Sequence, residues 1–357
     1  MADVRTVDVK QYVSTLPETT YNTAVSGGAN YVGVFGEQLA YILPQAEQVT
    51  NEGQQGRGHD LATALCQYNW LQPGFAISDK IQAFDGFMGR LALRGLGGTP
   101  TITQPVALTV YKHTVNPLPY SSGHQLPGST FIHELGADSF QLSGCVVERF
   151  KMMQSGVETP KFEVELVGTG KFTNPHGVTS LPTADPTYDC VDGNLSQFVW
   201  TDATPTTVDW STLSRVLSWS FEYKNNHRLS DRRQGDPLTG PTGGQLRHVR
   251  QILRGRMTVQ ASVSIAMASA DIAEWVAMAK NTLFTDVTFR ASGSVLSGST
   301  RGAIEAVMPK AKIKGDMTVT DQDGLAVVNF NLVPLYASAI GGLVQMAVTN
   351  TTATNFK

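Results

Sequence analysis

The sequence predicts a mainly β protein, an antiparallel β-sandwich or partly closed barrel with one packed α-helix and long loops. Three observations favour this fold class. Two stretches of the chain alternate apolar and polar residues with a period of two, the pattern of strands that bury one face. A Gly-containing turn follows the first of them and leads into another alternating run, as in a hairpin. One later segment, residues 270–281, instead has the period of an amphipathic helix.

The first alternating stretch, FQLSGCVVERFKM, spans residues 140–152. Its apolar residues fall mostly at even positions, namely Phe140, Leu142, Val146, Phe150 and Met152. After the turn QSGVETP, the segment KFEVELVG alternates again and places Phe162, Val164 and Leu166 on one face. The two runs therefore predict a β-hairpin.

The Gly144-Cys145 pair in this stretch raises the question of a nucleophile, a metal ligand or an unusual backbone. Gly144 falls in the apolar phase of the strand, which predicts a bulge or the close approach of another element. The three cysteines, Cys66, Cys145 and Cys190, are far apart and lack the spacing of a zinc site or a disulfide framework. They are interpreted as small buried residues in a reducing compartment.

A second pair of strands is predicted by LSWSFEY (217–223) and RMTVQASVSIA (256–266). The connection between them is about 30 residues long and contains GDPLTGPTGG. This is far longer than an ordinary hairpin connection. Connections of this length are usually functional, or disordered until they bind a partner.

The helix is predicted over 270–281, where Ser269 can cap the first turn and Asp271 suits the helix dipole. Its packing face is an apolar stripe formed by Ile272, Trp275, Val276 and Ala279. Further strands are expected in VALTVYKH (106–113), LFTDVTFR, AIEAVMPKAKI, GDMTVT and LAVVNFNLVPLYA. The turn TDQDGL favours a hairpin between the last two.

Three regions follow from this pass along the chain. Residues 1–60 are polar and rich in glycine, and are interpreted as an N-terminal arm and irregular lead-in. Residues 61–350 form the β domain, with an alternative division into halves at about 61–210 and 211–350. Residues 351–357 form a C-terminal tail. The N-terminus lacks the apolar region of a signal peptide, and no run of about 18 apolar residues exists that could span a membrane.

Sequence markers of catalysis are missing. GxSxG, HExxH and GxxxxGK[ST] do not occur, and GRLALRGLGGTP leads into an expected strand rather than a helix that could hold a phosphate. DQDG begins like a calcium loop, but Leu332 stands where the bidentate glutamate is needed. HELG has no second ligand at zincin spacing. We therefore expect no enzyme activity, no metal and no cofactor.

The charge is unevenly distributed. The segment from Lys224 to Arg256 contains eight Lys or Arg residues and two Asp residues, so its net charge is +6. The net charge of the whole chain is −3, so the remaining residues carry −9. The basic segment lacks aromatic residues for stacking on bases, which argues against direct DNA binding. A solvated loop and a subunit contact remain as alternatives, and the acidic remainder of the chain favours the contact. The candidate contact residues are Asn225, Arg228, Arg232, Arg233, Asp236, Arg247 and Arg250.

The order of elements from about residue 125 to 350 resembles that of the tail tube (major tail) proteins of tailed bacteriophages. The resemblance is carried by the Ser-Gly-Cys strand and its partner ending in VGTG, by SWSFEYKNN, the Gly-Pro loop, GRMTVQASVSI, the helix at 270–281, MPKAKIKG and DQDGLAVVNFNLVPL. At 357 residues the chain exceeds the minimal members of that family, which leaves a duplicated sandwich or decorations as alternatives.

The resemblance implies a virion structural protein that assembles with itself into stacked rings, hexameric when each chain carries one tube domain. Strands of neighbouring subunits would join into a lumen barrel, and the loop from Asn225 to Gln245 and the N-terminal arm would reach the adjoining ring. The lumen would hold a tape-measure protein and pass DNA during ejection. A tail terminator, baseplate or tip proteins and, in a contractile tail, a sheath protein are the further partners. Assembly would take place in the bacterial host cytoplasm.

Two other functions are compatible with the sequence. A different phage structural protein, such as a tail terminator or a decoration protein, would form closed single rings or bind a capsid. A β-sandwich carbohydrate-binding module would expose aromatic residues, for which Trp70, Trp200 and Trp210 in loop-like sequence are the candidates.

Overall fold

The computed structural model describes residues 9–34, 45–49, 67–71, 75–79, 87–135, 138–168, 172–173, 175–182, 191, 193–202, 216–229, 233–239, 245–249, 252–266, 284–322 and 324–357. Within these ranges, 16 strands form one antiparallel sheet, and a single α-helix packs against it. The predicted fold class, mainly β with one packed helix, is confirmed. None of the helical segments in these ranges is long and apolar enough to cross a lipid bilayer.

The main path through the large sheet runs β2 (Tyr31–Val34), β1 (Val9–Ser14), β8 (Ser129–Leu135), β9 (Asp138–Ser155), β13 (Val216–Lys224), β18 (Thr258–Ala266), β21 (Leu325–Pro334), β20 (Thr300–Gln322), β22 (Gln345–Asn350), β7 (Val110–Val115) and β6 (Thr101–Val106). Attached to this path are β5 (Phe75–Asp79), β10 (Lys161–Val167), β11 (Phe172–Thr173), β12 (Gln197–Asp202) and β19 (Phe284–Ser297). The short 3₁₀ turns are η1 (Gly28–Asn30), η2 (Tyr120–Ser122) and η3 (Gly193–Leu195).

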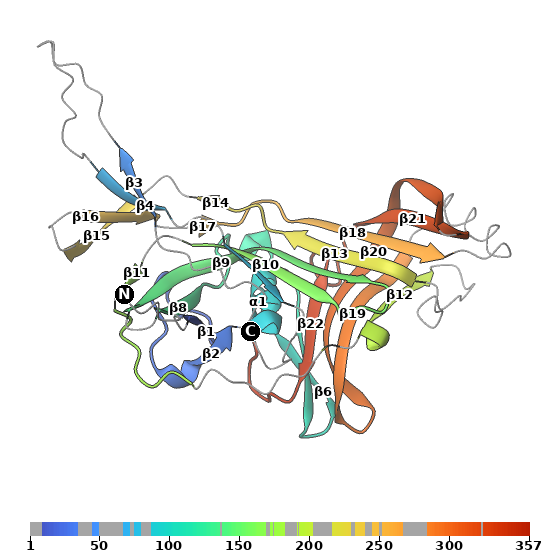
Figure 1. Ribbon diagram of the computed structural model, residues 1–357, viewed down its shortest axis with the longest axis horizontal. Coiled ribbons are helices and arrows are strands. Elements are labelled where there is room, and N and C mark those ends of the chain that lie inside the picture. Colours follow the sequence, from blue (N-terminus) through green and yellow to red (C-terminus); the bar gives the residue numbers. More distant parts are fainter. Residues whose placement is uncertain are drawn as a thin grey trace, which may run out of the picture.

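The helix α1 (Phe87–Leu96) lies in the middle of the molecule with strands around it (Figure 1). It packs against β9, β10 and β22, and also against β2 and β7 near the two ends of the strand order. The sheet therefore curves around the helix as a partly closed barrel would. All residues of α1 are buried, so it has no solvent face.

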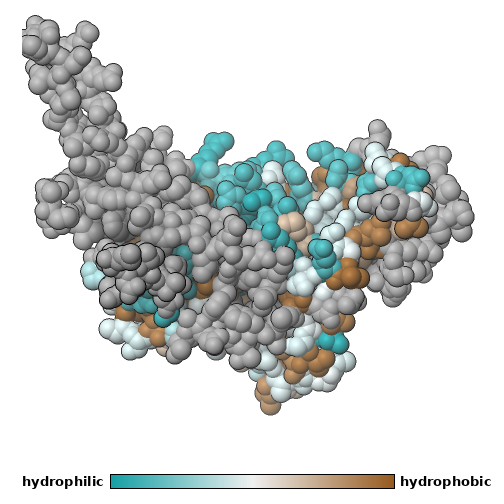
Figure 2. Space-filling model, in the orientation of Figure 1, coloured by the Kyte–Doolittle hydropathy of each residue, from teal (hydrophilic) through white to brown (hydrophobic). Residues whose placement is uncertain are grey.

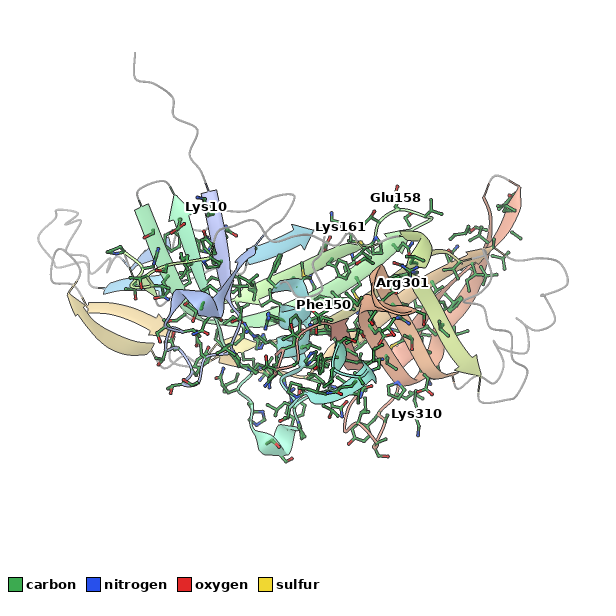
Figure 3. The ribbon with its side chains drawn as sticks, turned by 90° about the horizontal axis from the view of Figure 1, so that it is seen from below. Lys10, Phe150, Glu158, Lys161, Arg301 and Lys310 are labelled. Carbon is green, nitrogen blue, oxygen red and sulfur yellow. The ribbon has the colours of Figure 1, made fainter. Side chains whose placement is uncertain are left out.

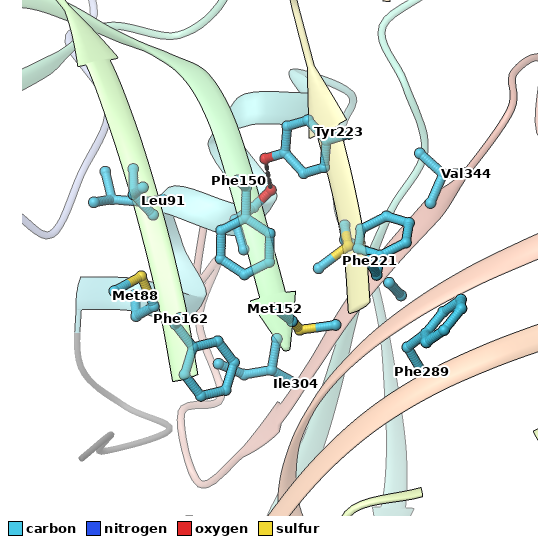
Figure 4. Packing of buried hydrophobic residues seen from close by; sticks show 14 of the residues in the cluster. Met88, Leu91, Phe150, Met152, Phe162, Phe221, Tyr223, Phe289, Ile304 and Val344 are labelled. Atoms are coloured by element: carbon cyan, nitrogen blue, oxygen red, sulfur yellow. Dashed lines mark hydrogen bonds between the residues drawn. The ribbon is translucent and has the colours of Figure 1, made fainter. Parts of the chain in front are cut away.

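The core is built from the alternating side chains of the strands. Phe150 on β9, Phe162 on β10 and Phe221 on β13 are fully buried and lie together with residues of α1 (Figure 4). Tyr223 on β13 donates its hydroxyl hydrogen to the carbonyl oxygen of Ala92 over 2.8 Å, which ties the sheet to the helix (Figure 4). Seen from below, Phe150 lies near the centre of the molecule and Lys310 lies near its edge (Figure 3).

The hairpins predicted from alternation are confirmed. Strand β9 pairs with β10, with Phe150 opposite Val164. Strands β13 and β18, separated by the long excursion, are direct antiparallel neighbours, with Phe221 opposite Ala261. The TDQDGL turn joins β20 to β21, and Gln322 lies opposite Leu325 across it. Period-two patterns succeed where a strand buries one face only, as in β10, β13, β18 and the second half of β9, whereas residues 140–148 of β9 are buried on both faces.

Four local predictions need comment. VALTVYKH is not one strand, because β6 ends at Val106 and β7 begins at Val110 after a tight turn. AIEAVMPKAKI and GDMTVT form one long strand, β20, with an irregularity between Lys314 and Thr318. Residues 9–34 are not an irregular arm, since β1 pairs with β8 inside the large sheet. The predicted helix with Ile272, Trp275, Val276 and Ala279 lies outside the described residues.

The bulge predicted at Gly144 is present. The pairing of β8 with β9 shifts between Ser129 and Phe131, and Gly144 has a φ of 71°, a left-handed conformation that favours glycine. The backbone N–H of Gly144 donates to Glu18 Oε1 over 2.8 Å. The neighbouring Cys145 is completely buried and packs in the hydrophobic core. This part of the strand therefore has a structural role.

The sheet is continuous across residue 210, because β9 and β13 pair directly. The C-terminal tail is also part of the fold. Phe356 is fully buried in the core, and the Arg90 guanidinium lies 4.0 Å above its ring. Lys357 Nζ donates to the carbonyl oxygens of Gly97 and Gly98, just past the end of α1. These hydrogen bonds tie the C-terminal tail to the segment that follows α1.

Candidate assembly surfaces

A small separate sheet projects from one end of the molecule (Figure 1). It contains β15 (Arg233–Thr239), β16 (Gln245–Val249), β4 (Gln67–Leu71) and β3 (Gln45–Val49), in that order, and we call it the arm sheet. Its two hairpins come from distant parts of the sequence and meet where β16 runs parallel to β4, with Arg247 opposite Asn69. The structure thus brings the basic excursion close to β3, a part of the N-terminal arm, and these are the two segments expected to contact a neighbouring ring.

The predicted contact residues divide between the arm sheet and its root. Arg233 and Asp236 lie on β15, and Arg247 lies on the neighbouring strand β16. Arg228 lies on β14 (Arg228–Leu229) and is exposed. Arg232 and Arg250 lie outside the described residues. Strand β14 pairs with β17 (Ile252–Leu253), so the excursion leaves and returns through a two-stranded root.

Asn225 is not a contact residue, and that prediction is wrong. It is completely buried, and its Nδ2 donates to the carbonyl oxygens of Gly95 and Val147, each over 2.9 Å. Gly95 is in the last turn of α1, where carbonyl groups lack partners within the helix. The side chain therefore anchors the start of the excursion to the core.

A hydrogen-bonded pair holds the next residue of the root. His227 donates from its backbone N–H to Glu148 Oε2 over 3.0 Å, and its Nδ1 lies 2.5 Å from the same oxygen. Burial alone would raise the pKa of Glu148, but the hydrogen bonds with His227 outweigh it and the pKa is lowered. The carboxylate is therefore charged at neutral pH and keeps this contact.

The returning strand is anchored by Arg254, a residue that sequence reasoning did not single out. Its backbone N–H donates to His124 O over 2.8 Å, its Nη2 donates to Leu118 O, and its guanidinium lies 4.5 Å from the centre of the Tyr120 ring. Arg254 is only 5% exposed. Both ends of the excursion are thus fastened, and the arm sheet projects from a fixed base.

We predict that Asn225→Ala lowers the free energy of unfolding by about 2 kcal/mol, because two buried carbonyl groups lose their donor. Arg228 lies a few residues further along the chain and is exposed. Arg228→Ala is therefore the matched control and should change the free energy of unfolding by less than about 0.5 kcal/mol. Urea denaturation measures both. Equal stabilities for the two variants would contradict the anchoring role of Asn225.

The outer face of β9, β10 and β13 carries paired charges. Arg149 contacts three carboxylates on neighbouring strands, with Nε 3.1 Å from Glu165, Nη1 3.4 Å from Glu222 and Nη2 3.8 Å from Glu163. Figure 2 shows hydrophilic side chains gathered on this side of the molecule, over β13 and β18. Because three carboxylates surround one guanidinium group, this cluster has an excess of negative charge and does not attract a polyanion such as DNA.

The large sheet has free edges among the described residues. Strand β6 pairs only with β7, and residues 101–105 are all exposed. Pro105, which has no N–H to offer a ladder, is typical of an edge strand. Leu108, at the tip of this hairpin, is 82% exposed, and apolar side chains mark the lower end of the molecule in Figure 2. Strand β12 likewise pairs only with β19. Exposed edges such as these can pair with another chain.

A metal centre and a sugar-binding surface are the other kinds of site to consider in the described part of the chain. No cluster of three or more His, Cys, Asp or Glu residues suited to a metal ion occurs there. Of the candidate carbohydrate-binding aromatics, Trp70 lies on β4 and Trp200 on β12, so they are in strands rather than loops. Trp210, Cys66 and Cys190 lie outside the described residues.

No model of a known protein family matches the chain, and no curated protein sequence is significantly similar to it.

Proposed function

We propose that this chain is a structural subunit of a bacteriophage tail tube, which assembles with itself into stacked rings around a channel. The observation that carries the proposal is the combination of an open sheet edge with a separate arm sheet projecting from a fixed root. A β protein that works alone usually covers or shortens its edges. A chain that presents an edge and an arm is suited to contacts in two different directions.

Lateral contacts use the edges of the large sheet. In a ring, the exposed edge β6 of one subunit would pair with a free edge of the next, and closure of the ring would leave no edge open. Backbone hydrogen bonds supply this contact, so it requires no particular side chain on β6. The exposed Ile102 and Leu108 would add apolar contact area at the hairpin.

Axial contacts use the arm sheet. Arg233 and Arg247 lie on its strands together with Asp236 and Glu47, so the arm sheet carries residues of both charge signs. Guanidinium groups that meet carboxylates of the adjoining ring would fix the register between rings. The buried anchors Asn225 and Arg254 hold the base of the arm, so its direction is set before assembly. Preorganisation of this kind lowers the entropy cost of association.

In this proposal the chain has no catalytic role. Its lumen would enclose a tape-measure protein during assembly and pass DNA during ejection, and its ends would meet a tail terminator and baseplate or tip proteins. Location in the virion follows from the same proposal. A terminator or decoration protein is the second candidate, because it could use the same exposed edge but would stop at a single ring or on a capsid.

Removal of the arm tests the proposal. We predict that replacing residues 230–251 with Asn-Gly leaves a folded chain that does not form tubes. Leu229 and Ile252 are already paired, so a two-residue turn can close the root without distorting it. The free energy of unfolding should change by less than about 1 kcal/mol, because the anchors in the core remain. Electron microscopy and urea denaturation measure the two outcomes.

The matched control shortens only the tip of the excursion. Asn-Gly replaces residues 240–244 between Thr239 and Gln245, which are paired across β15 and β16. All strands of the arm sheet remain, so this variant should still form tubes. Normal tubes from the variant without residues 230–251 would refute the assignment of axial contacts to the arm.

A further inference from the structure

A groove lies on the outer face of the large sheet, over the strands β9, β13, β18, β21 and β20. Its volume is about 840 Å³. Hydrophilic side chains gather over β13 and β18 on this side of the molecule (Figure 2). Ser220, Ser262 and Asn331 belong to its lining and lie opposite one another on β13, β18 and β21. Lys314 on β20 continues this row, so polar side chains cross the groove from strand to strand.

Three cationic side chains line the groove. Lys151 lies at one end on β9, Lys314 lies at the other end on β20, and Arg256 lies just before β18. Lys314 and Arg256 are exposed, and Lys151 is half-buried. In the described part of the chain, none of the three forms an ion pair with a carboxylate. Their positive charges are therefore available to a ligand.

Among the described lining residues, Glu222 is the one acid. It shares the guanidinium group of Arg149 with Glu163 and Glu165, and its Oε2 lies 3.4 Å from Arg149 Nη1. Three cations and one carboxylate give the lining a net charge of +2, which suits a ligand with carboxylate groups. A nucleic acid fits less well, because none of the described lining residues is aromatic and could stack on a base.

Two carboxamide side chains add hydrogen-bonding groups between the cations. Gln260 on β18 and Asn331 on β21 line the groove and are exposed. Neither carboxamide group forms a hydrogen bond within the described part of the chain. A carboxamide offers both N–H donors and a carbonyl acceptor, which are the groups that a peptide unit needs as partners. The lining therefore suits both the acidic side chains and the main chain of a peptide.

We infer that this groove binds an extended acidic segment of another protein. Lys151 and Lys314 are four strand spacings apart, roughly 19 Å. An extended chain of about six residues spans this distance. The two lysines would pair with carboxylates near the ends of the segment, and Gln260 and Asn331 would bond its peptide groups. This binding role is independent of the proposed tube function.

Fluorescence anisotropy with fluorescein-labelled hexaglutamate, at a salt concentration of about 0.15 M, tests the groove. Exposed charges more than about 8 Å apart are largely screened under these conditions. We expect Lys314→Glu to weaken binding by about tenfold or more, and Asn331→Ala by about threefold. Lys310 is exposed on the same strand but does not line the groove, so Lys310→Glu is the matched control and should bind like the natural chain.

Two other labelled anions of similar length identify the kind of ligand. Hexagalacturonate carries carboxylates on sugar units, and a strand of six thymidine nucleotides carries phosphates. Both should bind more weakly than hexaglutamate and should be insensitive to Asn331→Ala. Tighter binding of either one would overturn the assignment to a peptide. Equal losses for Lys314→Glu and Lys310→Glu, or no binding of hexaglutamate, would overturn the groove as a binding site.

Discussion

Replacing Gly95 with alanine is expected to lower the free energy of unfolding by about 3 kcal/mol. A Cβ at this position would lie 2.0 Å from the Tyr223 hydroxyl oxygen and 2.8 Å from Cζ. Tyr223 cannot withdraw, because it is fully buried, stacks on Phe150 at 5.7 Å and donates to Ala92 O. Overpacking costs about 1–3 kcal/mol, and loss of the buried hydrogen bond adds about 1 kcal/mol or more.

Two further variants make the measurement specific. Gly177 has no atom within 4 Å of its virtual Cβ, so Gly177→Ala should change stability by less than about 0.5 kcal/mol. Tyr223→Phe removes the oxygen that the new methyl group would meet, and should restore part of the loss when combined with Gly95→Ala. Urea denaturation compares all four chains. If Gly95→Ala behaved like Gly177→Ala, the close packing of α1 against β13 would be wrong.

Acidification is expected to destabilise the protein through His133. This residue is fully buried on β8, stacks on Phe140 with ring centres 4.9 Å apart, and lies opposite Gln11 on β1. Burial lowers the pKa of His133 from 6.5 to about 4. Below pH 6.5 the unfolded chain binds a proton that the folded chain does not, so stability falls as the pH drops toward 4. The full loss from this residue is about 3 kcal/mol.

The comparison that isolates His133 is the difference in unfolding free energy between pH 7 and pH 4.5, measured for the natural chain and for His133→Gln. The variant should lose clearly less stability on acidification, whatever its stability at pH 7. Glu18 acts in the opposite direction, because burial raises its pKa and acid then favours the folded state. Because Glu18 is present in both chains, its contribution cancels when their acid losses are compared. The same acid loss in both chains would contradict the assignment to His133.

Sequence patterns predicted the strands that bury one face. They missed helix α1, which is buried on all sides. The alternation around Phe150, Phe162 and Phe221 reports directly which side of each strand meets the core. Helix α1 has no such contrast, because even Arg90 and Arg94 are buried in it. With no polar face and with two glycines, FMGRLALRGL resembles a loop or a short strand in sequence. Only the surrounding sheet makes it a helix.

The same limit applies to the candidate contact residues. Asn225 looks like a loop residue in KNNHRLSD, yet its partners are Gly95 and Val147, far away in the sequence. The arm sheet depends on a parallel pairing of β4 with β16, two segments with more than a hundred residues between them. No local pattern encodes such a contact. Gly144 was predictable because a glycine in the apolar phase of a strand is a local signal.

The open edge at β6 and the projecting arm sheet make self-assembly the central claim for this protein. Negative-stain electron microscopy of the purified chain over a series of rising concentrations tests it most directly. A tail tube subunit should form long filaments with an axial hole at high concentration. Closed single rings would instead favour a terminator, and isolated monomers at every concentration would contradict self-assembly.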